Sequence, residues 1–170
     1  MHKESQEILQ QLQQVIHGKE AVLQSVWLTF LAGGHVLLED LPGVGKTTLA
    51  KAFSQVISLE EKRVQLTPDT VSSDLTGFMI YNQQHGSFTL KKGLVMTNIL
   101  LADELNRTSS RTQAALLEAM QEKQVTVDDT TYTLPVPFHV IATQNPSGSI
   151  GTRPLPLAQL DRFMTRLSMG

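Results

Sequence analysis

The fold is decided by the stretch Pro42-Gly43-Val44-Gly45-Lys46-Thr47-Thr48, which follows a short run of strand type at residues 35–39. A loop that binds phosphate needs glycine where its backbone turns inward, so that its N–H groups can face phosphate oxygens. Gly43 and Gly45 meet that need. Lys46 begins a helical segment, where its ammonium group and the positive end of the helix can both attract phosphate. This strand, loop and helix order predicts a nucleotide-binding arrangement.

The loop departs from the strict phosphate-loop pattern at one position. G-x-x-x-x-G-K-[ST] asks for glycine at position 40, where this sequence has Asp40. Aspartate adopts turn conformations, so we interpret the substitution as tolerable. The alternative is a glycine-rich turn without a ligand. We expect residues 42–48 to contact ATP and the Thr47 hydroxyl to hold Mg²⁺.

A second candidate group follows the apolar run at residues 98–102, which ends in Asp103 and Glu104. An apolar strand of a parallel sheet delivers the residues at its end to the sheet edge beside the phosphate loop. Asp103 would then support Mg²⁺ through water, and Glu104 would polarise the attacking water. Such a strand end is by itself more often a solvated surface. Together with the phosphate loop it favours a catalytic site.

The rest of the chain alternates between segments of helix and strand type, which predicts an α/β fold with a mainly parallel sheet flanked by helices. Two β-hairpins are predicted as insertions, turning at His85-Gly86 and at Asp128-Asp129. The expected helices cover residues 8–16, 21–32, 46–57, 108–121 and 156–161, the strands residues 35–39, 63–66, 99–103 and 138–143, and the hairpins residues 78–90 and 124–134.

Composition limits the possible functions. The chain has 170 residues, 41% of them hydrophobic, which suits a single domain spanning residues 1–170. A net charge of -2 gives no general attraction for polyanions. The absence of cysteine excludes disulfides and thiolate metal sites, and the five histidines have no metal-ligand spacing. No stretch predicts a membrane span or a signal peptide, so a cytoplasmic location is expected.

Longer runs of the sequence resemble the MoxR branch of the AAA+ ATPases. They extend the resemblance from the phosphate loop (Walker A) and the acidic strand end (Walker B) to nearly the whole chain. The matching runs are Gln65–Asp69, Ser73–Gly77, Leu101–Arg107, Thr112–Glu122, Ala142–Pro146 and Leu155–Phe163. Departures from the family pattern at Leu94, Met96, Ser147–Ile150, Arg153 and Leu157 affect details of subunit contacts rather than the phosphate chemistry.

The resemblance implies further roles for individual residues. Asn145 would be the sensor that aligns the attacking water, although an Asn-Pro turn is the simpler interpretation of these residues. Arg162 would be an arginine finger that reaches a neighbouring subunit's site, the alternative being a surface arginine near a helix end. Ile16 and His17 would lie against adenine, or else form a helix end in the core.

The resemblance also implies Mg²⁺-dependent ATP hydrolysis by a chaperone-like, protein-remodelling motor. It further implies a ring of identical subunits, expected to be a hexamer, a protein client and a partner with a von Willebrand factor A domain. A nucleic-acid motor is the main alternative, but the acidic turn Asp128-Asp129 disfavours contact with phosphates. A nucleotide-sensing scaffold without turnover is disfavoured by the presence of Lys46, Asp103 and Glu104.

Proteins of this class continue into a helical lid that covers the nucleotide. The eight residues that follow Arg162 are too few to form one. We therefore expect the 170-residue chain by itself to be a monomer with weak Mg²⁺-nucleotide binding and slow turnover, because water is poorly excluded without a lid.

Overall fold

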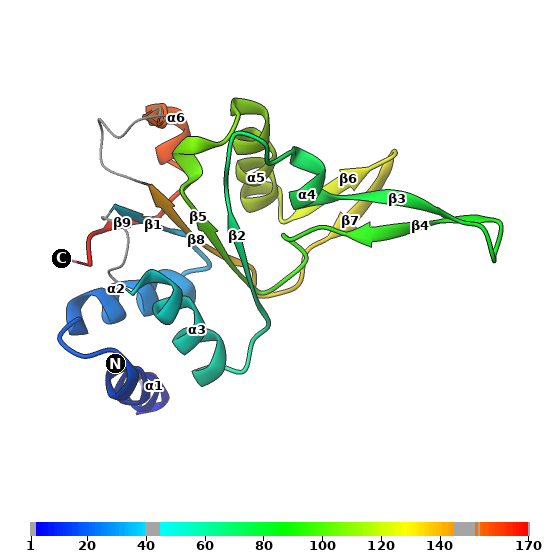
Figure 1. Cartoon of the computed structure of the whole chain (residues 1–170). Coiled ribbons are helices and arrows are strands. Elements are labelled where there is room, and N and C mark those ends of the chain that lie inside the picture. The colour runs from blue at the N-terminus through cyan, green and yellow to red at the C-terminus, as the bar shows by residue number, and fades with distance from the viewer. Residues whose placement is uncertain (1–2, 40–44, 145–151, 153, 170) are drawn as a thin grey trace.

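A parallel β-sheet lies between two layers of helices in the computed structural model, which describes residues 3–39, 45–144, 152 and 154–169 (Figure 1). Within these residues the main sheet has the strand order β2-β5-β8-β1-β9, and all of its neighbouring strands are parallel. This confirms the predicted α/β class. The strands are β1 (Val36–Glu39), β2 (Glu61–Gln65), β5 (Ile99–Asp103), β8 (His139–Gln144) and β9 (Thr165–Leu167).

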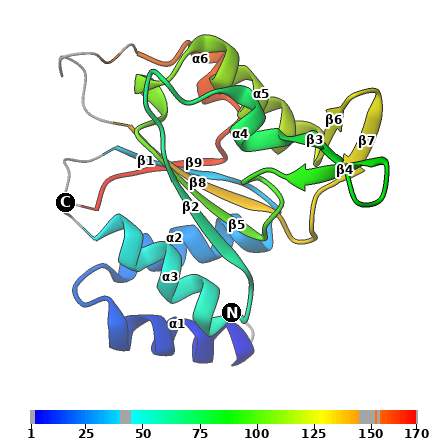
Figure 2. The ribbon, with the colours of Figure 1, turned by 45° about the vertical axis from the view of Figure 1, so that its right-hand side comes forward.

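The helices divide between the two faces of this sheet. One face carries α1 (Lys3–Val15), α2 (Glu20–Leu31) and α3 (Lys46–Val56), and the other carries α4 (Ser72–Thr76), α5 (Ser110–Glu122) and α6 (Leu157–Leu160) (Figures 1 and 2). A short 3₁₀ helix, η1 (Leu105–Arg107), connects β5 toward α5. None of the helices in the described part of the chain is long and apolar enough to cross a membrane.

Strand β5 shows why the central strands are apolar throughout. Its five residues are buried, and they alternate between the two cores of the molecule. Leu101 packs with α1, α2 and α3 in one core, whereas Leu100 and Ala102 pack with α5 in the other. A strand covered on both faces has no solvated side, so it is a continuous hydrophobic run. The polar residues can then begin only where the strand ends, at Asp103.

Two antiparallel ribbons project from the side of α4 and α5, as Figure 1 shows. The first pairs β3 (Gly77–Asn82) with β4 (Ser87–Lys92), and the second pairs β6 (Gln124–Val127) with β7 (Thr130–Thr133). Both predicted hairpins are therefore confirmed. At the turn of the second, Asp128 and Asp129 have φ of 45° and 62°, as tight hairpin turns require.

The segment from Ser72 to Gly93 differs from a simple strand-to-hairpin connection. The one-turn helix α4, which the sequence analysis did not predict, precedes β3; its start is held by the Asp74 carboxylate, which accepts a hydrogen bond from the Val71 N–H at 3.0 Å. Where β4 ends, beside the start of β3, a Cβ on Gly93 would lie 2.1 Å from the Leu75 carbonyl oxygen. The base of the ribbon therefore fits closely against α4.

The predicted start of α5 at Thr108 was two residues early. Thr108 ends η1 as its C-cap, Ser109 precedes the helix, and α5 begins at Ser110. Ser109 is the N-cap, and its hydroxyl accepts a hydrogen bond from the Thr112 N–H at 3.2 Å. The Gln113 amide, buried beneath this turn, donates to the carbonyl oxygens of Leu105 and Thr108.

Two buried histidines lie beside the start of the sheet. His35 Nδ1 accepts a hydrogen bond from the Val140 N–H at 2.9 Å, so that its other ring nitrogen donates to the Met120 carbonyl oxygen at 3.2 Å. The His139 ring stacks on Phe30, with ring centroids 4.2 Å apart. Burial lowers the pKa of both, that of His35 to about 4.

We expect the free energy of unfolding to fall by about 2 kcal/mol through His35 between pH 7 and pH 5. In this window the unfolded chain, with a histidine pKa of 6.5, binds more protons than the folded chain. Stability is therefore lost as the pH falls, and a proton on His35 Nδ1 would also oppose the Val140 N–H. Urea unfolding and an NMR titration of the ring test this; an ordinary His35 pKa in the folded protein would contradict it.

Candidate active site

The start of α3 is the described part of the predicted phosphate loop. Gly45, the N-cap of α3, has φ of 93°, in the left-handed region that favours glycine. Lys46, Thr47 and Thr48 form the first turn of α3; Lys46 and Thr47 are half-buried, and Thr48 is exposed. The first N–H groups of a helix have no partner within the helix and form an anion site. Pro42, Gly43 and Val44, the other predicted loop residues, lie outside the described residues.

The acidic pair lies at the same edge of the sheet. Parallel pairing brings the ends of β1, β5 and β8 together, and Gln65 at the end of β2 is opposite Asp103. Asp103 is buried, while Glu104 has φ of 59° and ψ of 48°. A residue other than glycine in this region costs of order 1–3 kcal/mol, and such strain is found mostly at functional sites. The strain is consistent with a functional role for Glu104.

The Asp103 carboxylate has a partner on each oxygen. Arg63 Nε on β2 donates to Oδ2 at 2.8 Å, and the Thr143 hydroxyl on β8 donates to Oδ1 at 3.3 Å. A carboxylate has about four lone-pair sites, so each oxygen can still accept another hydrogen bond. These contacts fix the orientation of the carboxylate and leave lone pairs on both of its oxygens for further hydrogen bonds.

Glu104 is held at both its backbone and its side chain. Its N–H donates to the Thr143 hydroxyl at 2.9 Å, and Arg107 Nη1 on η1 donates to its carboxylate Oε2 at 3.0 Å. Thr143, Arg63 and Arg107 were missed by the sequence analysis. The predicted acidic pair is thus held by hydrogen bonds to residues of β2, β8 and η1.

The residues that can hold Mg²⁺ are the Thr47 hydroxyl and the Asp103 carboxylate. The described part of the chain contains no cluster of three or more histidine, cysteine or acidic side chains suited to a metal. Mg²⁺ prefers oxygen ligands and is usually bound by one or two carboxylates, water and the phosphates of a substrate. The donor set therefore fits Mg²⁺ bound together with a nucleotide better than a resident metal.

The other predicted site residues are placed differently. Asn145 lies outside the described residues, directly after β8 in the sequence. Ile16 is buried in the core formed with α1, α2 and α3, as the alternative interpretation required, and His17 is exposed. Whether either contacts adenine stays a prediction.

Arg162 follows α6 on the opposite side of the sheet from α3 (Figure 1). Its guanidinium group donates to the Ala158 carbonyl oxygen at 3.2 Å and lies 4.0 Å from the Asp161 carboxylate. These are the surface contacts of the alternative interpretation. A role in a neighbouring subunit's site is a property of an assembly and stays a prediction.

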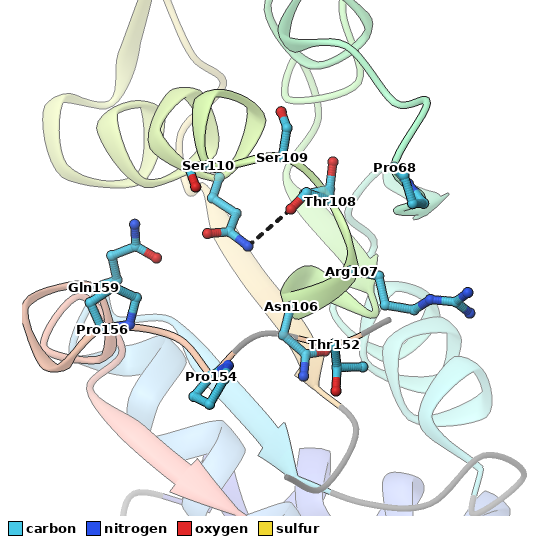
Figure 3. A pocket seen from close by; sticks show the side chains of 11 residues that line it. Pro68, Asn106, Arg107, Thr108, Ser109, Ser110, Thr152, Pro154, Pro156 and Gln159 are labelled. Carbon is cyan, nitrogen blue, oxygen red and sulfur yellow. Dashed lines mark hydrogen bonds between the residues drawn. The ribbon is translucent and has the colours of Figure 1, made fainter. Parts of the chain in front are cut away.

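A cavity of about 640 Å³ lies between the start of α5 and α6 (Figure 3). Arg107 lines it and connects it to Glu104 through their ion pair. The polar run at residues 106–110, Asn-Arg-Thr-Ser-Ser, is the sequence signal for this cavity. Its lining residues in the described part of the chain are Pro68, Asn106, Arg107, Thr108, Ser109, Ser110, Gln113, Thr152, Pro154, Pro156 and Gln159.

Residues 35–165, which include the phosphate loop, the acidic pair and both hairpins, match the ATPase family associated with various cellular activities (AAA). The chain belongs to the AAA family. The match covers the main sheet from β1 into β9, so this AAA domain has both the family sequence and the layered fold.

Similar proteins confirm the resemblance of this AAA chain to the MoxR branch. It is 51% identical to the uncharacterized protein YeaC of Bacillus subtilis over 95% of the chain and 51% of that protein. It is 42% identical to Chaperone MoxR1 of Mycobacterium tuberculosis over 94% of the chain and 42% of that protein. A crystal structure of a candidate ATPase from Cytophaga hutchinsonii matches with a TM-score of 0.87 and 47% identity, over 97% of the chain and 50% of that structure. The chain thus spans about half the length of these relatives.

Proposed function

We propose that this AAA chain binds Mg²⁺-ATP at the start of α3 and hydrolyses it. The observation that carries the proposal is the position of Gly45 and Lys46 at the same sheet edge as Asp103 and Glu104. A phosphate-binding helix start beside a carboxylate pair is the minimum arrangement for positioning the phosphates, a metal ion and a water molecule.

Each residue then has a distinct task. Lys46 binds the β and γ phosphates, and Thr47 and Asp103 hold Mg²⁺, Asp103 through water. Mg²⁺ would supply charge neutralisation on the phosphate oxygens as hydrolysis proceeds. Glu104 accepts a hydrogen bond from the attacking water and orients it. For this its carboxylate either leaves Arg107 or binds Arg107 and the water at the same time. Asn145 is proposed to align the same water.

The wider role that we propose is remodelling of protein complexes by a ring of these subunits, with a hexamer expected. It is supported by the family and by the name of one relative, Chaperone MoxR1. The β3–β4 ribbon exposes Phe78 and Ile80 on one face and the cross-strand pair Tyr81 and Phe88 on the other, apolar side chains suited to a polypeptide client. A partner with a von Willebrand factor A domain and a cytoplasmic location belong to the same proposal.

Lys46→Ala is expected to abolish Mg²⁺-ATP binding, because the predicted phosphate loop loses its side-chain cation. Isothermal titration calorimetry on the full-length protein measures the effect. Lys51→Ala is the matched control, since Lys51 is exposed five residues further along the same helix. Equal ATP affinity in Lys46→Ala and the parent would reject the nucleotide site.

A further inference from the structure

Thr143 lies at the point where the two proposed catalytic acids meet. It is the residue before the last of β8, is 1% exposed, and contacts both Asp103 and Glu104. We propose that Thr143 is a positioning residue for ATP hydrolysis, whose hydroxyl fixes the Asp103 carboxylate and the Glu104 backbone relative to each other. This inference rests on the proposed function.

The direction of both hydrogen bonds follows from the groups involved. A backbone N–H can only donate, so the Thr143 oxygen accepts from Glu104, at 2.9 Å. An ionised carboxylate can only accept, so the Thr143 hydroxyl donates to Asp103 Oδ1, at 3.3 Å. The single hydroxyl proton and one lone pair are both used, and valine, which has the same shape but no hydroxyl, can make neither contact.

The neighbouring cations cannot perform the same task. Arg63 binds Asp103, but its side chain is 49% exposed, and Arg107 binds Glu104 with a side chain that is 41% exposed. Ion pairs of such exposed side chains are weak and easily exchanged for water or another partner. The buried hydroxyl of Thr143 is neutral and enclosed by the sheet, so it holds both acids while leaving their negative charges available.

The position of Glu104 explains why its backbone needs an anchor. Glu104 adopts the left-handed conformation directly after a regular strand, and that conformation persists only where the surroundings impose it. The hydrogen bond from the Glu104 N–H to Thr143 provides such a constraint. Without it, the peptide group before Glu104 can relax, and the carboxylate then moves away from its position beside the phosphates.

Thr143→Val keeps the shape of the side chain and removes both hydrogen bonds. We expect kcat for ATP to fall by about tenfold to a hundredfold, with a much smaller change in KM, because the loss concerns alignment rather than substrate binding. Thr143→Ser should recover kcat to within a few-fold of the parent, since the hydroxyl is restored. Calorimetry should show a smaller gain in ATP affinity on adding Mg²⁺ for Thr143→Val than for Thr143→Ser.

The controls separate positioning from folding. Thr29→Val removes a buried hydroxyl that binds Ser25 and Thr165 on the α2 side of the sheet, so it should leave kcat unchanged. If Thr143→Val does not fold, Thr143→Ala and Thr143→Ser form a second pair that differs by one oxygen atom. Turnover within threefold of the parent in Thr143→Val or Thr143→Ala would overturn the assignment. A Thr143→Ser variant whose kcat is as low as that of the variants without a hydroxyl would overturn it as well.

Failure of the proposed function has a different signature. In that case the parent protein neither binds nor hydrolyses Mg²⁺-ATP, or the Glu104→Gln variant keeps the turnover of the parent. Either outcome also overturns the role assigned to Thr143. If the parent hydrolyses ATP and Glu104→Gln does not, the result for Thr143 stands on its own.

Discussion

Glu104→Gln is expected to lower ATP turnover by about a hundredfold to ten-thousandfold while leaving Mg²⁺-ATP affinity within a few-fold of the parent. The amide preserves the shape of the side chain but cannot act as the carboxylate that orients and activates water. It also loses the charge that Arg107 pairs with at 3.0 Å. Binding should survive because the phosphate contacts proposed for Lys46 and Thr47 do not involve Glu104.

Single-turnover kinetics and calorimetry on the same full-length preparation separate these two effects. Glu122→Gln, at the exposed end of α5, is the matched control for loss of one negative charge. Turnover that survives within a few-fold in Glu104→Gln would assign the activation of water to another residue. Loss of nucleotide binding would instead indicate that Glu104 supports the structure of the site.

The sequence was sufficient to predict those elements whose local pattern has one interpretation. Strand β5 was predicted with its observed bounds, because a buried apolar run followed by two acids cannot continue as a sheet core. The start of α3 at Lys46 was predicted from the glycine that precedes it, which takes the left-handed conformation. Both features depend on residues that are neighbours in the chain.

The contacts around the acids could not be predicted in the same way. Thr143 reaches Asp103 and Glu104 across 40 and 39 residues, and Arg63 reaches Asp103 across 40. Which side chains meet there depends on the strand order and register of β2, β5 and β8, and a shift of one residue would turn Thr143 to the other face. Helix α4 was missed because it is only five residues long, and its sequence Ser-Ser-Asp-Leu-Thr is also typical of a loop.

Arg162→Ala is expected to reduce hydrolysis in the assembled full-length protein by about a thousandfold or more while nucleotide binding stays largely intact. The contacts of Arg162 within its own subunit are those of an exposed side chain, with the Asp161 carboxylate 4.0 Å away. Such a pair contributes about 1 kcal/mol or less, so its loss should not unfold the protein. Arg111→Ala, an exposed arginine in the first turn of α5, is the control.

The action of Arg162 between subunits is tested by mixing two inactive variants. Lys46 begins α3 and Arg162 follows α6, and these two helices lie on opposite sides of the sheet. A finger role therefore requires the arginine of one subunit to approach the phosphates bound to its neighbour. Rings that contain both Arg162→Ala and Lys46→Ala subunits then hold interfaces where an intact Lys46 faces an intact Arg162. We expect hydrolysis to reappear at intermediate mixing ratios and to vanish for either variant alone. Mixed rings, verified by native mass spectrometry, that stay inactive at every ratio would refute the assignment, because they would contain both functional halves without forming a site.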